Sequence, residues 1–91
     1  LHALDDESEW VRRNAIEALG NIGPAASEAV PALSRRLQDP QSWIRHNAAM
    51  ALAKIGPAAT AAIPALRAKI ADEEGYASTN AAVALERIGA A

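Results

Sequence analysis

An internal repeat of 33 residues constrains this sequence more than any other feature. Trp10 recurs as Trp43, and the string Ile-Gly-Pro-Ala-Ala at 22–26 recurs at 55–59. A fixed period of this length is typical of stacked repeat architectures, in which each unit buries its apolar side against its neighbours. We therefore expect the chain to fold as a row of similar units and not as an irregular globule.

The repeat divides residues 1–91 into about two and a half units of one domain. The units span about 1–23, 24–56 and 57–91. The first four residues align with 34–37, so the first unit lacks most of one helix. Terminal repeats normally carry polar outer faces, and neither end here has one. We expect the chain to be part of a longer solenoid, or to associate end to end.

Each unit is predicted to contain two helices, which we call the A helix and the B helix. Apolar residues in 11–22 follow helical spacing, alanine is abundant, and β-branched residues are scarce. The A helices are expected at about 27–38 and 60–71, and the B helices at about 7–22, 40–55 and 73–88. The predicted fold class is therefore all-α, a right-handed α-solenoid.

The predicted B helices have chemical signals at both ends. Aspartates stand where an N-cap would accept from free backbone N–H groups; they are Asp6, Asp39 and Asp72. Pro40 is then expected at the first helical position, where no N–H is needed. Glycines follow each B helix as C′ residues; they are Gly23, Gly56 and Gly89.

One pattern within the repeat resembles the HEAT-repeat family. Pro31, Asp39, Ile44 and Arg45 match the family's proline, aspartate, aliphatic and arginine in full. The string at 11–23 is similar to the short bacterial version, called phycobilisome-lyase HEAT-like. The ankyrin and tetratricopeptide patterns, which have similar periods, are absent.

The resemblance implies an aspartate–arginine ladder between units, and a concave face lined by the B helices. In the third unit Ala77 and Ser78 replace the aliphatic residue and the arginine, so the ladder is expected to weaken there. On the concave face the family's variable positions correspond here to three aromatic–asparagine pairs and to nine further residues. These nine are Glu9, Arg13, Glu17, Ser42, His46, Met50, Gly75, Thr79 and Val83.

These three pairs are the main candidate site, and each has i,i+4 spacing that places both side chains on one helix face. They are Trp10/Asn14, Trp43/Asn47 and Tyr76/Asn80. An asparagine amide can pair with both polar groups of a peptide unit, and aromatic faces accept aliphatic stems or cations. The pairs also resemble the inner helices of armadillo-type nuclear import adaptors, which hold extended peptides. Alternatively, the aromatics pack between B helices and the asparagines form an internal ladder.

Other functions have weaker support in the sequence. The net charge of −2 argues against nucleic acid as the main ligand, and we expect no membrane span, because no apolar run approaches the ~20 residues that cross a membrane. There is no cysteine, and His46 aligns with Arg13 and Thr79 at a variable surface position. We expect no catalytic residues, metal or cofactor.

We therefore predict a scaffold, not an enzyme, that binds a protein or an extended peptide on the B helices. Two alternatives stay open. The first is a structural or oligomerising segment of a longer solenoid, suggested by the uncapped ends. The second, implied only by the family resemblance, is a HEAT-like subunit of a bilin lyase or another enzyme complex.

Overall fold

The structure, a computed structural model, describes residues 2–72 and 76–89, and within them the side chains of 2, 71–72 and 76–78 are not described. In this part of the chain every regular element is helical. The B helices are α1 (Glu9–Ile22), α3 (Ser42–Ile55) and α5 (Tyr76–Ile88). The A helices are α2 (Val30–Arg36) and α4 (Ile63–Asp72), and short 3-10 segments occupy His2–Asp5 (η1), Gly23–Ala29 (η2) and Gly56–Ala62 (η3).

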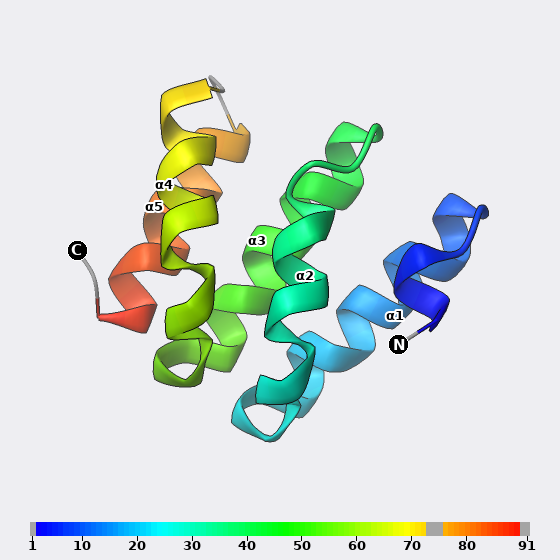
Figure 1. Cartoon of the computed structure of the whole chain (residues 1–91), viewed down its shortest axis with the longest axis horizontal. Helices are drawn as coiled ribbons and strands as arrows, with labels where there is room; N and C mark the ends of the chain where they lie inside the picture. The colour runs from blue at the N-terminus through cyan, green and yellow to red at the C-terminus, as the bar shows by residue number, and fades with distance from the viewer. Residues whose placement is uncertain (1, 73–75, 90–91) are drawn as a thin grey trace.

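The helices form two layers. Figure 1 shows α2 and α4 side by side in front of α1, α3 and α5. In the rear layer α3 packs between α1 and α5, while α2 packs on α3 and α4 on α5. The Cα atoms span 32 × 28 × 16 Å, a thin slab of the depth that two layers of helices give. This arrangement confirms the predicted all-α solenoid.

Glycine and proline make the turn from each B helix into the next A helix. Gly23 and Gly56 have φ of 74° and 69°, values that side chains disfavour, and the Gly23 N–H bonds back to the Leu19 and Gly20 carbonyls. The prolines that follow open the 3-10 segments η2 and η3. The regular A helices begin only after those segments, three residues later than the sequence predicted.

The predicted N-caps of α1 and α3 are wrong by two residues. The N-cap residues are Ser8 and Gln41, and Pro40 lies before the helix instead of at its first position. Asp6 and Asp39 instead accept from the backbone N–H two residues ahead, at 2.8 and 2.9 Å. Such Asx turns keep the second carboxylate oxygen available for another partner. The predicted cap Asp72 is not among the described side chains.

Alanine and leucine form a continuous core between the layers. Leu33 and Leu66 of the A helices are fully buried, as are Leu37 at the end of α2 and Ile44 and Leu52 of α3. Alanines at 48, 49, 81 and 84 are almost inaccessible, and their small side chains let α3 approach its neighbours closely. The repeat therefore places alanines and larger aliphatic residues at the core in both layers.

One segment corrects the expectation that no apolar run approaches the length of a membrane span. Ser42–Ile70 is 29 residues long and contains an 18-residue stretch with a mean hydropathy of 1.4, enough by length and composition to cross a membrane, although half of that stretch is buried. The segment is not straight, because Gly56 turns the chain and its second part, α4, lies in the other layer. Buried core helices can be as long and as apolar as a membrane span, and the residues of this segment that are buried belong to the core of the solenoid.

Candidate interaction site

The two tryptophans of the predicted site lie against each other between α1 and α3. Their ring centroids are 5.4 Å apart at an interplanar angle of 58°, a tilted aromatic contact. Trp43 is half-buried against the core, whereas 63% of Trp10 is exposed. The alternative hypothesis, packing between B helices, is thus correct for Trp43, and Trp10 keeps most of its surface open. Tyr76 begins α5, but its side chain is outside the described set.

Arg13 and Glu17 extend this aromatic pair along α1. The Arg13 guanidinium carbon lies 5.8 Å from the Trp43 ring centroid, within reach of a cation–π interaction. The same guanidinium pairs with Glu17 at 2.9 Å across one helical turn. Both residues were predicted at the site, and the structure brings them together with the tryptophans.

The three asparagines of the predicted row have three different environments. Asn80 of α5 contacts the His46 ring nitrogen of α3, so this asparagine has a neighbour within the solenoid. Asn14 is exposed and Asn47 is half-buried, and neither makes a side-chain hydrogen bond in the described part of the chain. The row is therefore not a uniform amide ladder, and two of its amides keep free donors and acceptors.

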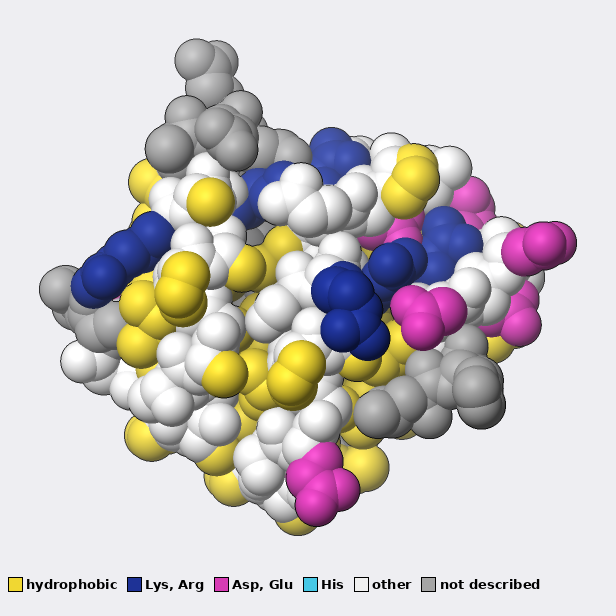
Figure 2. Space-filling model, viewed as in Figure 1, with side chains coloured by type: hydrophobic (Ala, Val, Ile, Leu, Met, Phe, Trp, Pro, Cys, Tyr) yellow, Lys and Arg dark blue, Asp and Glu magenta, His cyan; other side chains and the backbone are white. Residues whose placement is uncertain are grey.

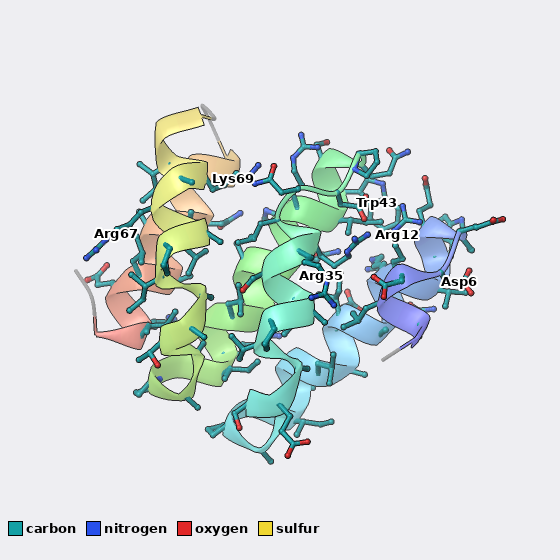
Figure 3. The ribbon with its side chains drawn as sticks, in the orientation of Figure 1. Asp6, Arg12, Arg35, Trp43, Arg67 and Lys69 are labelled. Carbon is teal, nitrogen blue, oxygen red and sulfur yellow. The ribbon has the colours of Figure 1, made fainter. Side chains whose placement is uncertain are left out.

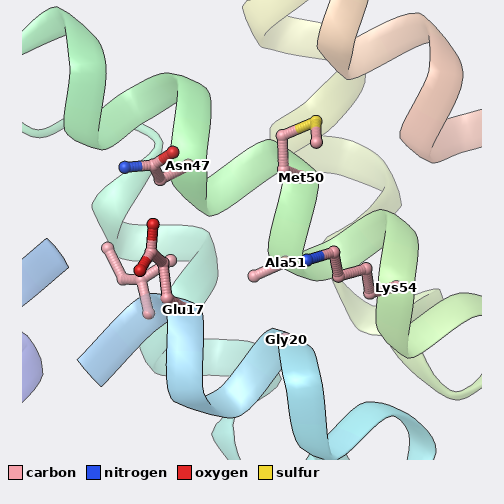
Figure 4. Close-up of a pocket in the computed structure, with 7 residues that line it drawn as sticks. Glu17, Gly20, Asn47, Met50, Ala51 and Lys54 are labelled. Carbon is pink, nitrogen blue, oxygen red and sulfur yellow. The ribbon is translucent and has the colours of Figure 1, made fainter. Parts of the chain in front are cut away.

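A hollow of about 120 Å³ lies between α1 and α3, and Figure 4 shows it in close-up. Its lining combines three predicted site residues with four others: Ile16, Glu17, Gly20, Asn47, Met50, Ala51 and Lys54. Met50 is 40% exposed, and Thr79 is exposed further along the face on α5. Glu17 of α1 and Asn47 and Met50 of α3 therefore meet at one concavity, which the other predicted residues of these helices do not line.

Gly20 is the residue that sequence analysis missed at this site. A Cβ atom at Gly20 would lie 3.1 Å from Ala51 Cα, so glycine permits the close approach of α1 and α3. Lys54 crosses over this contact and donates to Asn21 at 3.3 Å. The signal was in the sequence: glycine interrupts a helix where the other units have Ala53 and Glu86.

A buried ion network joins the first two units, and Figure 3 labels its central residue, Arg12. Arg12 of α1 donates to both Asp39 oxygens, at 2.8 and 3.3 Å, and to the Asp6 carbonyl at 2.7 Å. Arg36 also pairs with Asp39, at 3.1 Å. This is one rung of the predicted aspartate–arginine ladder. The next rung would join Arg45 to Asp72. The side chains of Asp72 and Ser78 lie outside the described set, so the predicted weakening of the ladder in the third unit stays a prediction.

The network also sets the protonation of Asp39. Burial alone would raise the pKa of its carboxyl group. The Gln41 N–H, the Arg12 hydrogen bond and the charges of Arg12 and Arg36 outweigh burial and lower the pKa below its ordinary value. Asp39 is therefore a structural anion, completely enclosed by its partners.

The opposite face, formed by α2 and α4, shows no single charge. Figure 2 shows separate groups of basic side chains there, with acidic side chains gathered at the N-terminal end. Exposed Arg35 and Arg67 belong to different helices. Among the described residues, no three metal-ligating side chains cluster together. The candidate site is thus a surface of mixed polarity on α1, α3 and α5.

Stacked helix pairs joined by a buried aspartate–arginine rung define an all-α helical-repeat protein. The chain belongs to the HEAT-repeat family, because the family model for HEAT repeats matches residues 1–86. No curated protein matches the chain. The finer similarity to bilin-lyase repeats stays a prediction.

Proposed function

We propose that this protein is a scaffold that binds a protein or an extended peptide on the exposed side of α1, α3 and α5. HEAT repeats are commonly protein-interaction scaffolds. The observation that carries the proposal is Trp10, a large aromatic ring that is 63% exposed beside Trp43. Aromatic residues are enriched at protein interfaces, where they supply much of the binding energy.

The polar groups around the tryptophans suit a peptide backbone. Asn14 lies one turn after Trp10, and Asn47 lies one turn after Trp43. Neither asparagine side chain makes a hydrogen bond among the described residues. Each amide can donate to a peptide carbonyl and accept from a peptide N–H. Packed helices lie ~8–10 Å apart, which about two to three extended residues span. One peptide could therefore engage both asparagines.

The charge of this surface gives little preference for a strongly charged ligand. Arg13 is already paired with Glu17, and Lys54 is bonded to Asn21. We therefore expect a ligand of mixed polarity, and we do not expect nucleic acid, a membrane, a cofactor or a metal to be the main partner. Catalysis is likewise not part of the proposal.

Peptide display followed by NMR titration tests the proposal. Random heptapeptides selected on the intact chain should shift the Trp10 and Trp43 indole N–H signals. Trp10→Ala should weaken binding about tenfold or more, the usual cost of losing an interface anchor. Ile22→Ala is the matched control, because it also removes an exposed apolar side chain but lies outside the proposed surface. Equal binding by both variants would refute the proposal.

A second candidate function is association with another helical unit through the outer side of α1. Ile22 is 56% exposed there, while Ile55 at the same repeat position in α3 is fully buried. Sedimentation equilibrium tests this candidate. A mass that rises with concentration, and returns to that of the monomer in Ile22→Lys, would favour association. A constant monomer mass would argue against self-association. The bilin-lyase alternative gains no support from a 120 Å³ hollow, and visible absorbance would test it.

A further inference from the structure

The hollow between α1 and α3 has an apolar floor. Ile16 is fully buried and Ala51 almost so, and Gly20 contributes no side chain. Because Gly20 has no Cβ, the floor extends to where the two helices meet. Met50 of α3 forms one wall with a flexible, apolar side chain.

The size of the hollow limits what can enter it. Cofactors and drug-sized ligands occupy pockets of roughly 300–1,000 Å³, whereas this one holds about 120 Å³. A dry protein cavity of roughly 150 Å³ admits benzene. A volume of this order suits a single side chain, and the apolar floor favours a branched aliphatic one.

The rim of the hollow is complementary to a peptide backbone. Figure 4 shows Glu17 and Lys54 toward opposite ends of it, with Asn47 near Glu17. A carboxylate can accept from a peptide N–H, and an ammonium group can donate to a peptide carbonyl. Glu17 is already paired with Arg13, whereas Lys54 donates to the neutral Asn21 amide, so a basic guest side chain would find no unpaired carboxylate at the rim.

From these observations we propose that the hollow is a specificity pocket for one valine, leucine or isoleucine side chain of an extended peptide. The inference rests on the proposed function and deepens it. The peptide backbone lies across the rim at Asn47, and the aliphatic side chain enters beside Met50 and rests on the floor where Gly20 and Ala51 meet. The neighbouring part of the peptide then contacts Trp10.

A host–guest peptide series tests the pocket. The strongest heptapeptide from display is resynthesised with each position replaced in turn by Gly, Leu, Phe or Lys. At one position Leu should bind about tenfold more tightly than Gly, because burying one or two methylenes in a pocket gives discrimination of that order. Phe and Lys should be weaker than Leu there, and the Leu peptide should shift the Gly20 and Ala51 amide signals.

Comparing Met50→Ala with Val83→Ala then distinguishes a specific pocket from non-specific binding to an apolar surface. Val83 occupies the Met50 position on α5 and is similarly exposed, at 38% against 40%, but it does not line the hollow. Met50→Ala should widen the pocket and reduce the Leu-over-Phe preference at least about fivefold, while Val83→Ala should leave it unchanged. Both variants are checked for unchanged helicity and unfolding midpoint.

The outcomes distinguish the two proposals. If binding depends on Trp10 but no peptide position prefers Leu, or if Phe or Lys is preferred there, the pocket proposal is refuted and the proposed function stands. A Leu preference that Met50→Ala does not alter also refutes the pocket. If no heptapeptide binds at all, the proposed function and the pocket fail together.

Discussion

Helices α1 and α3 have matching sequences but different surroundings. Both have 14 residues, and Trp10, Val11 and Ile22 of α1 correspond to Trp43, Ile44 and Ile55 of α3. In α3 the two aliphatic residues are fully buried, whereas Val11 and Ile22 are 38% and 56% exposed. The difference arises because α3 has a B helix on each side and α1 has one only on its α3 side. The contribution of a residue at a given repeat position to the free energy of unfolding therefore depends on which helices lie beside it.

The largest effect is expected at the aspartates that begin corresponding turns. Asp39→Asn leaves buried Arg12 without its counter-charge, and should lower the free energy of unfolding by about 4 kcal/mol. Asp6→Asn keeps the Asx turn at an exposed position and should cost less than about 0.5 kcal/mol. Urea unfolding followed by circular dichroism measures both. Equal losses would show that the rung between units contributes little.

The last residues of the two helices give the next comparison. Ile55→Ala creates a cavity in the core and should cost about 3 kcal/mol, whereas Ile22→Ala should cost less than about 0.5 kcal/mol. Residue type and helix position are the same, so only the neighbours differ. Guanidinium unfolding curves would contradict the comparison if the two midpoints fell together.

The tryptophans should differ less. Trp43→Ala removes a half-buried ring and should cost about 2 kcal/mol, and Trp10→Ala about 0.5 kcal/mol. Iodide quenching gives an independent measurement, because Trp10 in the Trp43→Phe variant should be quenched more than Trp43 in the Trp10→Phe variant. Equal quenching would mean that the pair is equally exposed.

The smallest effect concerns pH. The pKa of Asp39 is lowered in the folded state, so its ionisation stabilises the fold above the unfolded pKa of about 3.9. That stability is lost as pH falls through the folded pKa. Between pH 5 and pH 2 the parent chain should therefore lose more stability than Asp39→Asn, as measured by urea unfolding at each pH. Parallel curves for the two proteins would exclude this linkage.

The repeat and the helix-ending glycines were predictable from the sequence, because they depend on local spacing, whereas the binding surface stays a prediction. The N-caps were predicted two residues early. Asp39 forms an Asx turn before the helix, and its carboxylate also accepts a hydrogen bond from Arg12, 27 residues away in the sequence. The three asparagines were treated as equivalent, although Asn80 contacts His46 of the neighbouring helix. The hollow was also missed, because it exists only where Gly20 meets Ala51.

The sequence by itself determined that this chain is a row of helix pairs. The 33-residue period, the alanine-rich amphipathic segments and the Gly-Pro turns specify each unit locally. The tertiary structure alone decided which of two matching residues is buried, which amide is left free and where α1 and α3 leave a hollow. Those properties depend on contacts between units, since identical side chains acquire different burial and partners when their neighbours differ.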